Sequence, residues 1–200
     1  MIHNLLEEQL PYHLLALLVL AVFYGIYFIK MFIQKRQGIQ THQIGRRKEV
    51  KLHRVETFMS IATFGIVLAQ LFSIAMGWNH MPANGRFTGF CIAMIGNLIF
   101  LTAVVCMKNS WRAGIPEKDK TELVTDGIYA FSRNPAFLGF DLQYIGFLLM
   151  YCNILTAGFT AFAMIMLHLQ ILQEEKYMTD TFGDTYTAYK KSVFRYLGRR

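Results

Sequence analysis

Two adjacent carboxylates, Glu174 and Glu175, stand directly after a long apolar segment near the end of this 200-residue sequence. Carboxylates at the edge of a bilayer lose hydration, so they are more often functional than incidental. Gln170 precedes Glu174 by four residues, which places both side chains on one face of a helix. Asp141 and His168 lie in the two apolar segments just before this point. Together these groups would form an electronegative site that favours a cationic or amine-bearing ligand.

A polar loop punctuated by glycines precedes these segments, with the sequence Leu-Val-Thr-Asp-Gly-Ile-Tyr-Ala-Phe-Ser-Arg-Asn-Pro-Ala-Phe-Leu-Gly over residues 123–139. Asp141 lies one helical turn beyond Phe137, so the two side chains can face the same cavity. We expect Gln170 to face that cavity as well. His168, as a lone histidine on an apolar helix, is more often a buried core residue than a catalytic one.

Several other chemistries lack their motifs in this chain. The sequence contains no His-Glu-x-x-His pattern, which argues against a zinc protease, and no Gly-x-Ser-x-Gly elbow, which argues against a serine hydrolase. The six histidines are scattered, and we predict no metal site.

The composition is that of a membrane protein, because 54% of the residues are hydrophobic and only 16% are charged, against about 25% charged in soluble domains. Four apolar blocks have about the twenty residues needed to cross a bilayer, namely Pro11–Ile33, Thr57–Trp78, Phe87–Met107 and Ile154–Leu172. A fifth block, Ala136–Tyr151, is shorter, but a short or tilted helix can still cross. The sequence therefore predicts an all-α integral membrane protein with five transmembrane helices.

The basic residues predict the orientation of these helices. Five spans would place alternating linkers at residues 34–56, 79–86, 108–135, 152–153 and 174–200. Of the 20 Lys and Arg, all but Arg86 fall in or beside the first, third and fifth linkers. The positive-inside rule then puts those linkers and the C-terminus in the cytosol and the N-terminus outside. The net charge of +7 thus reflects topology, and we expect no nucleic-acid partner.

The two halves of the chain differ in character. Residues 1–107 read as a three-helix transmembrane scaffold, in which we take the first block as a retained span because Glu7 and Glu8 stand where a signal peptide would carry Lys or Arg. Residues 108–200 read as the catalytic region, with a cofactor loop, a helical hairpin and a cytosolic C-terminal helix broken at Gly183. The basic linker Gln34–Arg54 is interpreted as a loop facing lipid headgroups, with gating of substrate entry as the alternative.

One combined pattern carries a family resemblance. It reads Leu-Val-x-x-Gly-x-Tyr-x-x-x-Arg-Asn-Pro-x-Phe-x-Gly, then a helical hairpin, then Glu-Glu-x-x-x-x-x-x-Phe-Gly-x-x-Tyr-x-x-Tyr-x-x-x-Val-x-Arg. This pattern, over about Trp111–Tyr196, resembles the isoprenylcysteine carboxyl methyltransferase family, a group of integral-membrane enzymes that also resemble phospholipid N-methyltransferases.

The resemblance implies an S-adenosylmethionine-dependent methyltransferase that acts on a hydrophobic, membrane-borne acceptor and binds its cofactor at the cytosolic mouth of the helices. Carboxylates and aromatic faces suit the sulfonium and ammonium groups of that cofactor. The implied cofactor-binding positions are Thr121, Glu122, Leu123, Val124, Tyr129, Asn134, Pro135, Ala136, Phe137 and Glu174. The membrane would be the inner membrane of a prokaryote or the endoplasmic reticulum of a eukaryote, with the active site facing the cytosol.

Two departures from the family pattern bear on the acceptor. Family members that act on a prenylated cysteine carry an Arg five residues before the second Glu, where this chain has Gln170. Asp141 replaces an apolar residue of the eukaryotic enzymes. Both changes disfavour a carboxylate acceptor and favour a neutral or amine-bearing lipid, unless Arg133 replaces the missing cation.

The sequence leaves the roles of individual residues open. A base is needed only if the acceptor holds a proton, and Asp141, His168 and Glu175 are its candidates. The candidate catalytic and acceptor-contacting residues are Glu175, Gln170, Asp141, His168 and Arg133. The alternatives are a transporter or ion-pathway protein that uses Asp141, Glu174 and Glu175, and a nicotinamide-dependent membrane reductase.

Overall fold

The computed structural model of the protein describes residues 2–44, 50–115 and 121–199. In these ranges the secondary structure consists of helices, apart from isolated β-bridges. The elements are α1 Ile2–Arg36, α2 Val50–Met76, α3 Ala83–Cys106, the short 3-10 helices η1 Lys108–Ser110 and η2 Gly127–Ala130, α4 Pro135–Met150 and α5 Ile154–Ser192.

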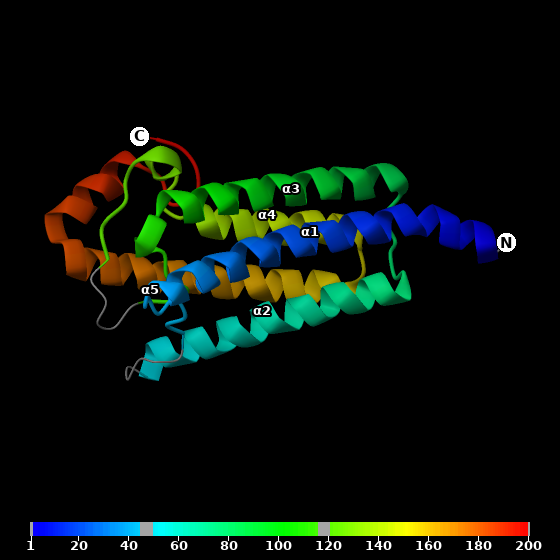
Figure 1. The fold of residues 1–200 in the computed structure, drawn as a ribbon, viewed down its shortest axis with the longest axis horizontal. Coiled ribbons are helices and arrows are strands. Elements are labelled where there is room, and N and C mark those ends of the chain that lie inside the picture. Colours follow the sequence, from blue (N-terminus) through cyan, green and yellow to red (C-terminus); the bar gives the residue numbers. More distant parts are fainter. Residues whose placement is uncertain (1, 45–49, 116–120, 200) are drawn as a thin grey trace.

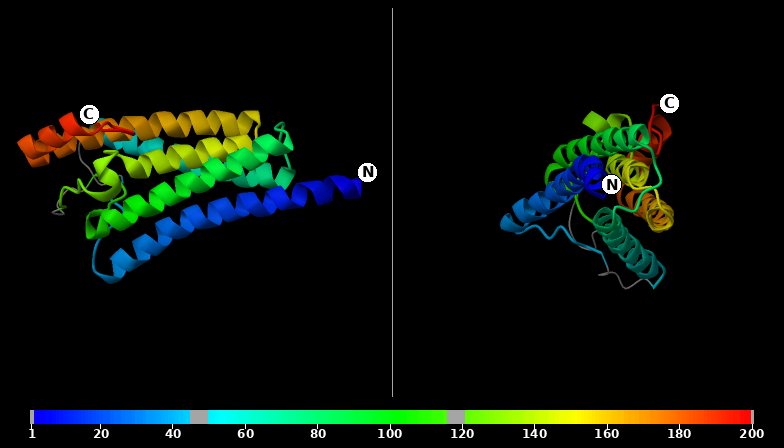
Figure 2. Two further views of the ribbon diagram at one scale, coloured as in Figure 1. Left: turned by 90° about the horizontal axis from the view of Figure 1, so that it is seen from above. Right: turned by 90° about the vertical axis from the view of Figure 1, so that its right-hand side faces the viewer.

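The five α-helices lie side by side along the long axis of the molecule (Figures 1 and 2). Successive helices run in opposite directions, so their connections gather at the two ends of the bundle. The N-terminus and the connections at residues 77–82 and 151–153 lie at one end (Figure 1). The segments 37–44, 107–115, 121–134 and 193–199 lie at the other, which we call the capped end.

Among the described residues, four helices are long and apolar enough to cross a membrane, at Gln9–Arg36, Leu52–Met76, Ala83–Cys106 and Ile154–Ser192. This confirms the prediction of an all-α integral membrane protein. The short apolar helix α4 has 16 residues and rises about 24 Å, less than the ~30 Å of a hydrocarbon core. Length and composition therefore support four of the five predicted spans.

Glycines bring α4 unusually close to α3. Gly89 of α3 faces Gly146 of α4, and Gly96 faces Gly139. The two glycines on each helix are seven residues apart. A Cβ atom built on Gly96 would lie 2.7 Å from both the backbone N of Gln143 and the backbone O of Gly139. Close backbone approach through small residues is a main source of helix association in membranes. The short helix is thereby fixed along the flank of a longer one.

Side chains tie the hairpin turn between α4 and α5 to the α2–α3 connection. Asn153 caps α5 by accepting a hydrogen bond from the Thr156 N–H at 3.0 Å, and its amide donates to Ser73 Oγ at 3.0 Å and to the Trp78 carbonyl at 2.9 Å. Nearby, Arg86 donates through Nε to the Met150 carbonyl at 3.0 Å. The one basic residue predicted outside the cytosolic linkers therefore has a packing role.

The glycine contact predicts a large stability difference between two Gly→Ala changes. Gly96→Ala should destabilise the protein by about 1–3 kcal/mol, because the new methyl group meets backbone atoms that cannot move cheaply. Gly158→Ala is the matched control, since no atom lies within 4 Å of its Cβ position, and its unfolding temperature should be unchanged or slightly raised. Thermal unfolding of both variants in detergent measures the difference, and equal effects would contradict this account of α3–α4 packing.

Candidate functional site

The C-terminal part of α5 turns back over the capped end. Gly183 has a non-helical backbone with φ 53° and ψ −126°, a left-handed φ that favours glycine. The predicted break at this residue is confirmed. Beyond it the chain returns toward η2 (Figures 1 and 2), where Tyr186, Tyr189 and Val193 form a buried cluster that contacts Leu123.

Hydrogen bonds attach this returning segment to the loop before α4. Tyr189 Oη donates to the Tyr129 carbonyl at 2.6 Å. The Asn134 side-chain amide donates to the Arg195 carbonyl at 3.1 Å. Burial raises the pKa of the Tyr129 phenol, and the ionisable groups of Tyr189 and Glu174 add to the rise. Three predicted cofactor-binding residues, Tyr129, Asn134 and Glu174, therefore gather at the capped end.

An ion-pair cluster around the buried Glu175 carboxylate joins α5 to both of these segments. Arg195 donates to both carboxylate oxygens of Glu175 at 2.9 Å, and Arg133 Nη1 lies 3.1 Å from Glu175 Oε1. The hydrogen bond to Glu175 raises the pKa of the Arg195 guanidinium. Two guanidinium groups around one carboxylate leave a net positive charge. Arg133 Nε is buried and has no hydrogen-bond partner in the described part of the chain.

The neighbouring carboxylate has a different environment. Gln170 Nε2 donates to Glu174 Oε1 at 3.1 Å, as their four-residue spacing predicts. The Gln170 side chain is buried, and its Oε1 atom lacks a partner within the described residues. This free carbonyl oxygen and the Glu174 carboxylate are two hydrogen-bond acceptors side by side, and they suit a ligand that carries N–H groups or positive charge.

Asp141 and His168 lie apart from these carboxylates, in a groove of about 350 Å³ between α4 and α5. Tyr196 also lines this groove. His168 Nδ1 and Tyr196 Oη are hydrogen-bonded at 2.6 Å. Burial raises the pKa of Tyr196, and the nearby Asp141 adds to it. Asp141 Oδ1 is buried with no partner among the residues described.

The expectation that Gln170 and Asp141 face one cavity is therefore wrong. Gln170 is not among the residues that line the groove. Successive helical residues are rotated by about 100°, so His168 and Gln170 point in different directions from α5. His168 meets Asp141 across the groove, whereas Gln170 packs inside the bundle beside Glu174.

The remaining predicted cofactor-binding positions surround the start of α4 and the loop ahead of it. Residues 121–124 form an extended segment in which the Glu122 N–H donates to Ser110 Oγ at 3.2 Å. Pro135 opens α4. Ala136 packs against a buried cluster that includes Phe100 and Trp111. Phe137 packs against another that includes Ile66 of α2 and Leu167 of α5. These positions all belong to the capped end, although Glu122 is exposed at its rim.

Two contributors to the site escaped the sequence-based reasoning. Arg195 occurs in the Val-x-Arg end of the combined pattern, and Tyr196 follows it. Neither was assigned a role, because their proximity to Glu175 and Asp141 depends on how the chain turns at Gly183. The signal that could have found them was that same glycine followed by a regular Tyr-x-x-Tyr spacing.

The apolar helices and the polar cluster at one end define an integral-membrane helical protein with a charged site at the rim of its bundle. The model of the isoprenylcysteine carboxyl methyltransferase (ICMT) family matches residues 88–180. The matched segment contains most of α3, all of α4, and Arg133, Glu174 and Glu175. Over this segment the chain is similar to that family.

Curated relatives carry the same family name. The chain is 29% identical over 110 residues to protein-S-isoprenylcysteine O-methyltransferase B of Arabidopsis thaliana, covering 52% of this chain and 55% of that protein. It is 38% identical over 72 residues to protein-S-isoprenylcysteine O-methyltransferase of Schizosaccharomyces pombe, covering 36% of this chain and 30% of that protein. It is 33% identical over 124 residues to the Dictyostelium discoideum protein of that name, covering 58% and 52% respectively. The chain thus spans about half the length of these relatives or less.

The ion-pair cluster predicts that Arg195 holds the returning segment in place. Arg195→Ala should destabilise the protein by about 1.5–3 kcal/mol, because it removes two charge-assisted hydrogen bonds from a buried carboxylate. Arg199→Ala removes the same charge from an exposed position nearby and should have little effect. Thermal unfolding, together with hydrogen exchange over residues 184–199, measures both variants. Equal protection of this segment in Arg195→Ala and the wild type would contradict the prediction.

Proposed function

We propose that the protein transfers a methyl group from S-adenosylmethionine to a hydrophobic acceptor that reaches the capped end from the bilayer. The observation that carries this proposal is the family match over residues 88–180, which coincides with the part of the bundle where charged and unpartnered polar groups gather. The relatives named above are O-methyltransferases by name.

The residues at the capped end fit the chemistry of the cofactor. Glu174 offers a carboxylate and Gln170 offers a buried, unpartnered carbonyl oxygen, which suit the ammonium and sulfonium charges. Residues 121–124 and the start of α4 would enclose the remainder of the molecule. When bound, S-adenosylmethionine would supply an activated methyl group, and the protein's main task would be to align the acceptor and exclude water.

We further propose that the acceptor presents a carboxylate, as an S-isoprenylcysteine does. The sequence-based preference for a neutral or amine-bearing acceptor rested on Gln170 standing in place of an Arg. Two observations favour the other outcome. Arg133 and Arg195 together outnumber the single charge of Glu175, and Arg133 Nε is buried without a partner in the described chain. The names of the relatives point to the same acceptor class.

This assignment gives each residue a defined task. Arg133 would hold the acceptor carboxylate, and Glu175 with Arg195 would hold Arg133 in place. A carboxylate carries no proton at neutral pH, so no general base is needed. Glu175 would then act as a positioning residue because its carboxylate already pairs with two guanidinium groups.

The proposed topology has five spans, with α4 as a short span and the capped end in the cytosol. The basic linkers at that end support this orientation through the positive-inside rule. The cytosolic placement also suits a soluble cofactor.

An amine-bearing lipid is the second candidate acceptor. The groove between α4 and α5 contains Asp141, whose Oδ1 is buried and has no partner among the residues described. A carboxylate in such a place would attract a cationic headgroup. In that case Asp141 or His168 would take the proton of the amine.

The cofactor assignment predicts that Glu174→Gln weakens binding of S-adenosylhomocysteine about tenfold to a hundredfold, because a charge-assisted contact is worth about 1.5–3 kcal/mol. Asp180→Asn, an equivalent change at an exposed position of the same helix, should leave the affinity unchanged. Calorimetry of the purified proteins measures both. Unchanged binding in Glu174→Gln would remove this residue from the site, and no binding by the wild type would favour the transporter alternative.

The acceptor assignment predicts which methylated product forms. The wild type should convert a farnesylated cysteine analogue to a base-labile methyl ester, and Arg133→Gln should lower this activity at least tenfold. Arg199→Gln is the matched control. The assay follows labelled methyl transfer from S-adenosylmethionine to a panel of prenyl-cysteine, aminophospholipid and thiol acceptors. A base-stable product formed only from amines, and lost in Asp141→Asn, would establish the second candidate instead.

A further inference from the structure

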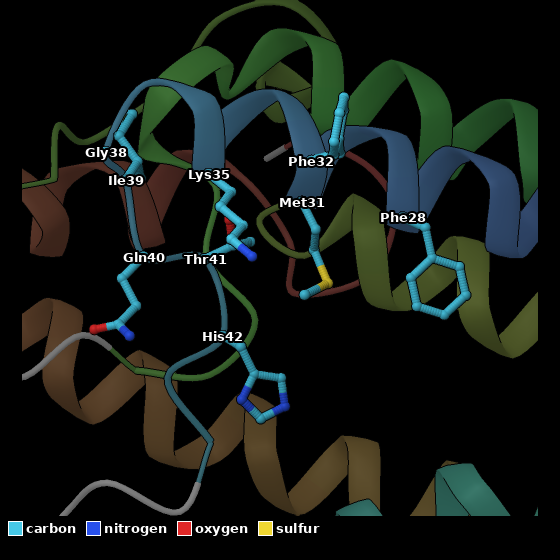
Figure 3. Close-up of a pocket in the computed structure, with 9 residues that line it drawn as sticks. All are labelled: Phe28, Met31, Phe32, Lys35, Gly38, Ile39, Gln40, Thr41 and His42. Carbon is cyan, nitrogen blue, oxygen red and sulfur yellow. The ribbon is translucent and has the colours of Figure 1, made fainter.

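A separate groove lies at the capped end beside α1, where the helix gives way to the segment 37–44. Its volume is about 650 Å³, and one wall is formed by Phe28, Met31, Phe32 and Lys35. Their spacing of i, i+3, i+4 and i+7 places the four side chains along one face of the helix. Figure 3 shows Met31 and Lys35 extending from the helix toward the segment that carries His42.

The opposite wall is held in place by buried hydrogen bonds. Thr41 Oγ1 donates to Gln34 Oε1 at 2.7 Å, and Gln34 Nε2 donates to the Trp111 carbonyl at 3.0 Å. The Ala113 N–H donates to the Thr41 carbonyl at 3.0 Å. These bonds tie the segment to the α3–α4 connection, and Gln34 and Thr41 are buried, so water does not compete for them. The groove is therefore formed before any ligand enters.

The polarity of the groove changes along α1. Phe28 and Phe32 are 60% and 54% exposed, on a helix apolar enough to cross a membrane. Lys35 follows at the capped end and is exposed, and its ammonium group has no ion-pair or hydrogen-bond partner in residues 2–44, 50–115 and 121–199. Arg36 adds a second positive charge, with its guanidinium carbon 4.3 Å from the centre of the Phe32 ring.

An apolar wall that ends in free positive charge is complementary to a molecule with a hydrocarbon chain and an anionic head. We propose that this groove binds a phospholipid with an anionic headgroup. One acyl chain lies along Phe28 and Met31, and the phosphate lies at the Lys35 ammonium. Positive side chains at a membrane surface attract anionic lipids by about 1 kcal/mol each. The site is independent of methyl transfer, since it uses none of the residues assigned to the cofactor or the acceptor.

The test uses delipidated full-length protein and dioleoyl phosphatidylglycerol, with bound lipid counted by native mass spectrometry. The wild type should bind this lipid more tightly than dioleoyl phosphatidylcholine. Lys35→Ala should weaken phosphatidylglycerol binding about fivefold, and Lys35→Arg should retain it because the charge remains. Lys30→Ala is the matched control, since Lys30 is on the same helix but does not line the groove.

Four results would overturn the proposal. Equal binding of the two lipids would show that no headgroup is recognised, and equal losses in Lys30→Ala and Lys35→Ala would show only a general effect of surface charge. Displacement of the lipid by millimolar inorganic phosphate would indicate a site for a free anion. Displacement by a farnesylated cysteine analogue would identify the groove as the path of the methyl acceptor.

Discussion

The arrangement of the capped end depends on one buried carboxylate. Glu175 lies on α5 and pairs with Arg133, just before α4, and with Arg195, beyond the break at Gly183. Removing one partner of a buried ion pair is costly because the other charge is left without compensation. The loop before α4 and the end of the chain therefore have to meet at the same point of α5, and Tyr189 and Asn134 close the remaining gaps between them.

The shortness of α4 has its own role in this arrangement. Asn134 and Pro135 are buried, so the polar loop before α4 enters the bundle rather than lying over it. The glycine contacts with α3 hold the short helix at this depth. Under the proposed function, a water-soluble cofactor and a lipid-borne acceptor have to meet at such a place, below the surface but within reach of polar side chains.

Hydropathy and local signals predicted much of the fold. The four long apolar blocks each become a helix, and Gly183 breaks α5 as its position after the acidic segment indicated. The expectation that Gln170 and Asp141 face one cavity failed because helical periodicity fixes the face on which each residue lies but not the helix that this face contacts. The role of Arg195 depends on a tertiary return of the chain. The ion pair between Arg133 and Glu175, which are 42 positions apart, likewise follows from the packing of α4 and α5 rather than from any sequence spacing.

The return of the chain at Gly183 also sets the order in which the protein can mature during synthesis. Arg195 completes the Glu175 cluster, and Tyr196 completes the groove beside Asp141. Both residues are translated after all five helices. A nascent chain in which α1 to α5 have formed thus still has an incompletely paired carboxylate at the capped end. The segment that follows α5 then converts this bundle into one with a closed site.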